Sequence, residues 1–114
     1  SAPAASSSEV VARAYEELGK PYAWGASGPD AFDCSGLVGY CLTGRYGNHW
    51  CSTSTIITWP RVSASDAKPG DICVSSTHTG VYIGNGKMIH APHTGDVVKI
   101  GDVQSNMVFV RYAG

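Results

Sequence analysis

The spacing of apolar residues along this chain changes once, near Pro69-Gly70. Before that point, apolar residues recur at helical intervals in two segments, residues 10–18 and residues 37–42. After it come short β-rich segments that Gly and Asn separate: DICVS, TGVYIG, KMIHA, DVVKI and MVFVRY. Helices followed by strands predict an α+β fold, in which N-terminal helices pack on a small antiparallel β-sheet whose strands form a meander.

Start and stop signals bound the first predicted helix. Ser6 and Glu9 stand three residues apart, as in a capping box, and Gly19 follows the last apolar residue as a natural stop. Three further elements are predicted before the strands: a Gly- and Pro-rich loop over residues 20–33, a helix from about Cys34 to near Gly44, and a short helix around residues 52–58.

The length of 114 residues supports one domain with one core. A net charge of −1 and the absence of a Lys/Arg run give no electrostatic support for nucleic acid or an anionic membrane as a partner. No segment approaches the ~18 apolar residues of a membrane span, so membrane insertion is not expected. Residues 1–8, SAPAASSS, have the composition of a linker remnant or disordered tail, which suggests that residues 9–114 come from the C-terminal end of a longer protein.

The segment FDCSG places Cys34 at the expected start of the second helix, between Asp33 and the small residues Ser35 and Gly36. Backbone N–H groups and the positive end of the helix dipole favour a thiolate there, so we expect the pKa of Cys34 to lie below the free-thiol value of ~8.5. Small neighbours let a substrate approach the sulfur. The alternative is a buried cysteine that packs as a small hydrophobic residue, and the polar flanks weaken that alternative.

A thiolate nucleophile needs a base, and His78 and His90 lie in neighbouring predicted strands that residues 84–86 join. A two-residue Asn-Gly loop would set His78 opposite His93. A three-residue Gly-Asn-Gly loop places His78, Tyr82 and His90 on one face and apolar residues on the other. We prefer the second register because it separates polar from apolar residues more cleanly. It makes His78 and His90 diagonal neighbours on one face.

Together these residues predict the arrangement of a cysteine hydrolase. Cys34 would be the nucleophile, His78 the base, and His90 the group that orients the imidazole. Each histidine alone is more often a half-exposed surface residue, so the prediction depends on the combination. A zinc site has little support because no Cys-x-x-Cys or His-x-x-x-His pair occurs, and no metal or other cofactor is expected.

Two blocks of sequence, GKPYAWGASGPDAFDCSGLVGY and the later KPGDI with HTGVYIGNGKMIHA, resemble the NlpC/p60 family of cell-wall cysteine peptidases. The resemblance spans residues 9–112, with both blocks in the order of the family. It implies a papain-like core, in which a helix that carries the cysteine packs on a sheet that carries the histidine. It also implies hydrolysis of an amide bond in the peptide stem of bacterial peptidoglycan, next to D-glutamate.

The family pattern supplies a role for several further residues. Tyr22 matches a tyrosine near the scissile carbonyl, whose phenol could donate to the developing oxyanion beside the Cys34 backbone N–H. Asp33 and Ser35 match positions that contact the substrate, and an aspartate there suits a positively charged stem amine. Trp24 is expected to shape the cleft. For Tyr22 and Trp24, plain core packing is an equally good interpretation.

The chain departs from the family pattern in two segments, DICVS and HWCST, both expected near the rim of the cleft. Several rival functions share the same core: an amidase that cuts the muramyl-alanine bond, a cell-wall-degrading toxin, and a non-catalytic wall-binding module. The resemblance implies a monomeric catalytic domain that acts outside the cytoplasm, secreted, at the cell surface or in the periplasm, with peptidoglycan stem peptides as its partners.

The remaining cysteines are odd in number, so at most one disulfide can form among Cys41, Cys51 and Cys73. Disulfides persist outside the cytoplasm, where a cell-wall enzyme acts. The segment TGRYGNHW could let the chain double back, so a Cys41–Cys51 disulfide is the hypothesis, and three free buried thiols are the alternative. An unstrained bridge of that loop length would contribute about 2–3 kcal/mol.

Overall fold

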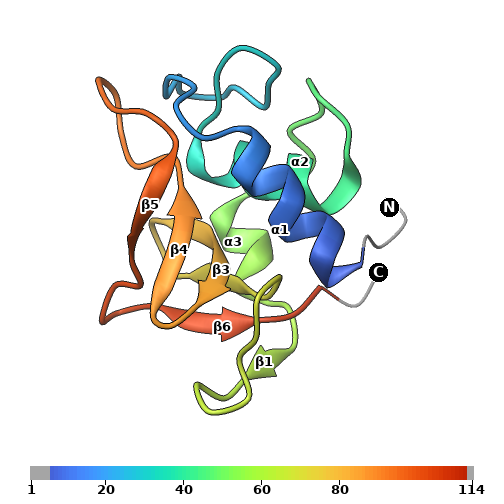
Figure 1. Ribbon diagram of the computed structural model, residues 1–114, viewed down its shortest axis with the longest axis vertical. Coiled ribbons are helices and arrows are strands. Elements are labelled where there is room, and N and C mark those ends of the chain that lie inside the picture. Colours follow the sequence, from blue (N-terminus) through green and yellow to red (C-terminus); the bar gives the residue numbers. More distant parts are fainter. Residues whose placement is uncertain (1–5, 113–114) are drawn as a thin grey trace.

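The computed structural model describes residues 6–112, and its first element is helix α1, Ser7–Glu16 (Figure 1). The predicted capping box is confirmed, because the Ser6 side chain accepts from the Glu9 backbone N–H and the Glu9 carboxylate accepts from the Ser6 backbone N–H. Since α1 begins at Ser7, the linker predicted over residues 1–8 overlaps the helix. Residues 1–5 lie outside the described residues.

Two further helices follow near their predicted places. Helix α2, Cys34–Thr43, ends at Gly44, which has the left-handed conformation of a helix C-cap with φ 73°. The short helix α3 spans Thr53–Ile56. None of the helices within residues 6–112 has the length and apolar character that a membrane crossing requires.

The second half of the chain forms one antiparallel sheet with the strand order β1-β6-β2-β3-β4-β5. Its strands are β1 Arg61–Val62, β2 Ile72–Val74, β3 Thr79–Gly84, β4 Lys87–His90, β5 Lys99–Asp102 and β6 Val108–Val110. The predicted α+β fold, with helices packed on a small antiparallel sheet, is confirmed.

The predicted meander holds for β2 to β5 but is wrong for the last strand. Strand β6 returns to pair with β2, and β1, which the sequence did not predict, pairs with the other edge of β6. The buried Asp71 carboxylate fixes this return, because the Arg111 guanidinium forms two hydrogen bonds with it, at 2.7 and 2.9 Å.

The hairpin of β3 and β4 has the preferred register where it matters for the histidines. Val81 pairs with Ile89 and Tyr82 with Met88, as the three-residue loop predicts. Beyond Tyr82 the register shifts, and Gly84 pairs with Lys87. The turn itself is therefore the two-residue Asn-Gly loop. An irregularity between Tyr82 and Gly84 shifts the register by one residue, so the preferred pairing holds from Tyr82 back toward His78.

Helix α2 lies at the centre of the molecule, between α1 and β3. Its residues from Ser35 to Leu42 are all buried, so neighbours surround the helix on every side. From α1, the Arg13 guanidinium donates to the Cys41 carbonyl oxygen at 3.0 Å. Only the two end residues of α2, Cys34 and Thr43, are partly exposed.

The Cys41–Cys51 disulfide hypothesis is wrong in this structure, in which all four cysteines are free. Cys51 lies against the face of α2 that carries Ser35 and Gly39: its Sγ is 4.0 Å from the Ser35 carbonyl oxygen. Cys41 is two residues beyond Gly39, about 200° around the helix, so it points toward α1 instead. The chain does double back to α2, as expected, but Cys51 reaches the face of the helix that carries Gly39 and not the face that carries Cys41.

We therefore expect a thiol titration to find four reactive thiols per chain in denaturant without reductant. In the folded protein only Cys34 should react quickly, because Cys41, Cys51 and Cys73 are between 0 and 4% exposed. Two missing thiols in the unreduced, unfolded protein would instead indicate a disulfide.

Candidate active site

Asp33 holds the start of α2 and so sets the position of Cys34. Its backbone is extended, and its Oδ1 accepts from the Gly36 backbone N–H at 2.7 Å, which is an N-cap bond. A side chain at Gly36 would collide with the Ala26 carbonyl oxygen, so only glycine allows the loop before α2 to lie this close. Asp33 and Gly36 of the local sequence DCSG thus set the geometry of the helix start.

Cys34 lies between this helix start and the beginning of β3. The expectation that its pKa is lowered is wrong: burial is the main cause that raises the pKa of the thiol, and the nearby Asp33 charge adds to it. Backbone N–H groups of Ser35, Thr79 and Cys34 itself act in the opposite direction but do not outweigh burial. The resting group is therefore a thiol, and it needs a base to take its proton.

His78 and His90 form the pair that the hairpin register predicts. His78 Nε2 lies 2.8 Å from His90 Nδ1, and the two rings meet edge to face. Burial lowers the pKa of His78, and burial followed by the His78 charge lowers the pKa of His90 to about 4. Both rings are therefore neutral near pH 7. When His78 Nε2–H donates to His90, its Nδ1 carries the lone pair that can accept a proton.

Two glycines leave room for the His90 ring, a feature that the sequence did not suggest. A Cβ added at Gly101, on β5, would lie 2.6 Å from His90 Nε2. A Cβ added at Gly80, on β3, would lie 3.0 Å from the His90 Cβ. The neighbouring strands therefore hold the ring in a slot that larger residues would close.

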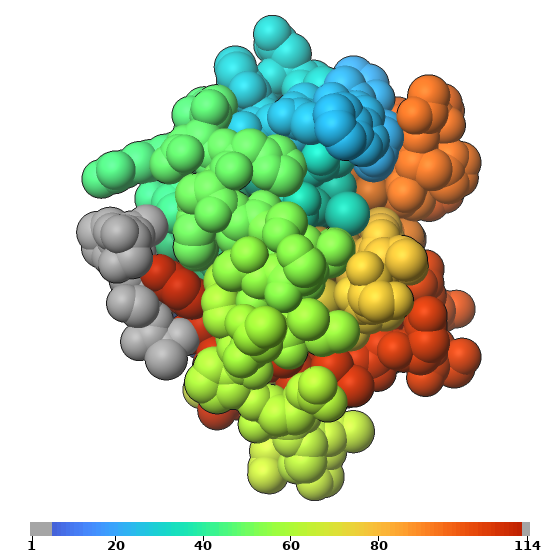
Figure 2. Space-filling view, turned by 180° about the vertical axis from the view of Figure 1, so that it is seen from behind, coloured from blue at the N-terminus to red at the C-terminus, as the bar shows by residue number. Residues whose placement is uncertain are grey.

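A cleft of about 430 Å³ opens beside Cys34. Segments far apart in the sequence surround it on one face of the molecule, where Figure 2 shows residues near 24, 34, 50 and 77 in blue, teal, green and gold. Its lining includes Tyr22, Trp24, Asp33, Cys34, Ser35 and His49. The structure thus brings the predicted substrate-contacting residues together around the cysteine, while their roles stay predictions.

The two aromatic residues differ in how they contribute. Trp24 is 87% exposed, so core packing does not explain it. Tyr22 is half-buried and packs against the core as well as lining the cleft. Burial, then the charges of Asp33 and Cys34, raise the pKa of the Tyr22 phenol, which therefore keeps its proton and remains a hydrogen-bond donor.

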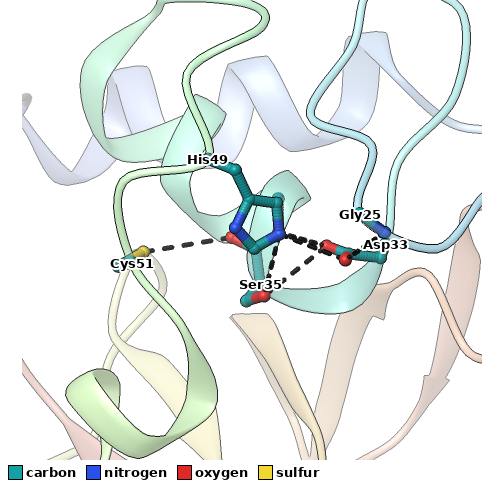
Figure 3. A network of polar contacts seen from close by, with 6 residues as sticks. Gly25, Asp33, Ser35, His49 and Cys51 are labelled. Atoms are coloured by element: carbon teal, nitrogen blue, oxygen red, sulfur yellow. Dashed lines mark hydrogen bonds and ion pairs between the residues drawn. The ribbon is translucent and has the colours of Figure 1, made fainter.

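His49 is a cleft residue that the sequence reasoning missed. Its Nε2 lies 2.9 and 3.1 Å from the two Asp33 carboxylate oxygens and 3.3 Å from Ser35 Oγ (Figure 3). It is the first residue of HWCST, the segment that departs from the family pattern, so the departure itself was the available signal. Because one ring nitrogen makes both contacts, His49 cannot relay a proton from Ser35 to Asp33.

The arrangement can perform nucleophilic chemistry at a thiol. It offers a partly exposed Cys34 beside the start of β3, a neutral imidazole at His78 directly before that strand, a second imidazole that contacts the first, and a phenol donor. Within residues 6–112, no group of three or more His, Cys, Asp or Glu side chains is placed to hold a metal ion.

Comparison with known proteins identifies the family. The model of the NlpC/P60 family matches residues 19–114. The chain belongs to the NlpC/P60 family, as the resemblance of its sequence predicted. Helices packed on an antiparallel sheet are also what the solved structures of this family contain.

Three relatives illustrate the similarity. The chain is 38% identical to the probable endopeptidase p60 of Listeria grayi, over 90% of this chain and 21% of that protein. It is 42% identical to a probable endopeptidase of Corynebacterium glutamicum, over 79% of this chain and 45% of that protein. It is 33% identical to the crystal structure of the NlpC/p60 domain of the peptidoglycan hydrolase SagA, with a TM-score of 0.75, covering 94% of this chain and all of that domain. The chain thus spans about a fifth of the length of the first curated relatives, 20 and 21%.

Proposed function

We propose that this chain is a cysteine endopeptidase that hydrolyses an amide bond in the peptide stem of bacterial peptidoglycan, next to D-glutamate. The observation that carries the proposal is the contact of 2.8 Å between His78 Nε2 and His90 Nδ1, since His78 directly precedes β3, whose first residue Thr79 lies beside Cys34. The printed names of the relatives, endopeptidases and a peptidoglycan hydrolase, support the substrate class. Residues 9–114 would be the catalytic domain of a longer protein, monomeric and active outside the cytoplasm.

In the first half of the reaction, His78 Nδ1 takes the proton of the Cys34 thiol as the sulfur attacks the carbonyl carbon. The carbonyl electrons move onto oxygen, where the Tyr22 O–H and the Cys34 backbone N–H stabilise the negative charge. His78 then gives its proton to the leaving amine nitrogen, the C–N bond breaks, and a thioester with Cys34 remains. His90 keeps the His78 ring oriented throughout.

In the second half, water replaces the amine. His78 Nδ1 takes a proton from the water as its oxygen attacks the thioester carbonyl. The C–S bond then breaks, a carboxylic acid leaves, and the proton on His78 returns to the sulfur. No cofactor takes part in this sequence, which begins and ends with a thiol and a neutral imidazole.

Digestion of purified peptidoglycan tests the proposal. Mass spectrometry of the soluble products should show new termini within the peptide stem, at a bond that involves D-glutamate. New termini at the bond between muramic acid and alanine would show an amidase instead. Binding of the cell wall without any new terminus would show a non-catalytic module.

The pKa shifts define the expected pH dependence of kcat/KM. Because the pKa of His78 is lowered, the neutral base persists below pH 6.5, and activity should fall only at more acidic pH. Because the pKa of Cys34 is raised, the shared proton is lost only above pH 9.0, where no proton remains for the leaving amine. A bell-shaped profile with a broad top is the expected result.

A hydrolysis assay across this range, with thiol alkylation rates measured in parallel, locates both limbs. Half-maximal activity well above pH 6.5 on the acid side would mean that His78 is more basic than its burial allows. A thiolate already formed at neutral pH would mean that the helix start outweighs burial and lowers the pKa of Cys34, as the sequence alone suggested.

A further inference from the structure

The Asp33 carboxylate has little capacity left for a ligand. Oδ1 accepts from the Gly36 backbone N–H at 2.7 Å, and Oδ2 accepts from the Gly25 backbone N–H at 2.8 Å. On the side of the cleft, His49 Nε2 contacts both carboxylate oxygens, Oδ1 at 2.9 Å and Oδ2 at 3.1 Å. Ser35 Oγ also lies 3.5 Å from Oδ1. A substrate ammonium group would need the position that His49 now fills.

In the bond between His49 and Asp33 the imidazole N–H is the donor and the carboxylate oxygens accept. The His49 side chain comes from the exposed segment of residues 44–49, between α2 and α3, and is 30% exposed, whereas the Asp33 side chain is 10% exposed. Asp33 is therefore fixed by backbone N–H groups, and His49 is the partner that can leave.

We propose that His49 is a specificity-determining residue that covers the Asp33 carboxylate, so that a cationic group in the cleft reaches Asp33 only when the His49 imidazole releases it. The enzyme would then discriminate only weakly between a substrate with a free amine and its acylated counterpart. Without His49, the carboxylate is open to the cleft and attracts cations. The application to a stem-peptide amine rests on the function proposed above, but the covering of Asp33 does not.

Cys34 itself supplies a probe of the exposed charge, since it is the partly exposed cysteine and Cys41, Cys51 and Cys73 are buried. Aminoethyl methanethiosulfonate is cationic, and ethyl methanethiosulfonate is a neutral analogue of similar size. Each converts the thiol to a mixed disulfide and releases methanesulfinate. The ratio of their rate constants at Cys34, with the site of labelling confirmed by mass spectrometry, measures the negative charge that the cleft presents.

In His49→Ala the cationic-to-neutral ratio should rise about fivefold, the factor expected from one partly exposed charged contact. Asn48→Ala is the matched control, because it changes the adjacent exposed residue of the same segment, and it should leave the ratio unchanged. The double variant Asp33→Asn with His49→Ala keeps a residue that can cap α2 but lacks the negative charge. Its cationic-to-neutral ratio should therefore return to the wild-type value. An unchanged ratio in His49→Ala, or an equal acceleration with both reagents, overturns the proposal.

A second measurement separates this inference from the proposed substrate. In a Cys34→Ala background, a stem peptide with a free N-terminal amine and the same peptide acetylated at that amine are titrated by calorimetry. His49→Ala should tighten binding of the free amine about fivefold and change binding of the acetylated peptide less than twofold. Weaker binding of the free amine overturns the proposal. If the labelling ratio rises as expected but neither peptide binds, the stem peptide is the wrong substrate and the covering of Asp33 stands.

Discussion

Replacement of Cys34 by alanine should reduce hydrolysis of cell-wall fragments by roughly 10⁴-fold or more, because no other group in the cleft can form the thioester. The fold should remain, since Cys34 is at the emerging end of α2 and the cap bond from Asp33 to Gly36 does not involve the sulfur. The assay compares product release by wild type and variant on intact cell-wall fragments, with circular dichroism as the check on folding.

Cys73→Ala is the matched control for the loss of a cysteine. Cys73 is fully buried in β2, so its removal should cost about 1–2 kcal/mol of unfolding free energy and leave turnover nearly unchanged. Activity that survives in Cys34→Ala would exclude the proposed mechanism. If Cys73→Ala loses as much turnover as Cys34→Ala, the loss in Cys34→Ala would come from lower stability and not from the missing nucleophile.

The next largest effect is expected at His90. His90→Ala should slow turnover by about 10²-fold, because the His78 ring then loses the acceptor that holds its Nε2–H at 2.8 Å and keeps Nδ1 free for the thiol. His90→Asn offers an amide oxygen as a replacement acceptor and should recover part of the loss. If His90→Asn recovers turnover, the loss in His90→Ala comes from the missing hydrogen-bond acceptor for His78 and not from lost packing.

His93 is the control for this prediction. Its side chain is 72% exposed, and its ring contacts Thr94 and Asp96 in the turn after β4. His93→Ala should change turnover less than twofold, since this ring does not contact His78. A larger loss at position 93 than at position 90 would mean that the orienting group had been assigned to the wrong histidine.

Local signals predicted the parts of the fold that depend on a few adjacent residues. The capping box of Ser6 and Glu9 and the left-handed Gly44 lie where the sequence placed them. The pairing of His78 with His90 also followed from the sequence, because side chains alternate along a strand and one of the two registers separates polar from apolar residues more cleanly. The family resemblance then joined these positions to Cys34.

The features that the sequence missed depend on distant residues. The return of β6 to β2 brings Arg111 onto Asp71, a pairing of residues forty positions apart that no local pattern reveals. The direction of the Cys34 pKa shift follows from how deeply the sulfur is buried, and that depth is a property of the packed core. The place of His49 follows from the path of the segment after α2, which the departure of HWCST from the family pattern marks but does not determine.

Helix α2 is enclosed on all sides, and this enclosure has a consequence for how the molecule fluctuates. Its buried amides can exchange with solvent deuterium only when the core itself opens, so their exchange should report the full free energy of unfolding. Residues 44–49, the segment that carries His49, are exposed and lie outside regular secondary structure, with Tyr46 stacked on Tyr40, so their amides should exchange faster than those of α2. The nucleophile is thus at one end of a helix that should exchange slowly, while His49 belongs to a segment whose amides should exchange faster.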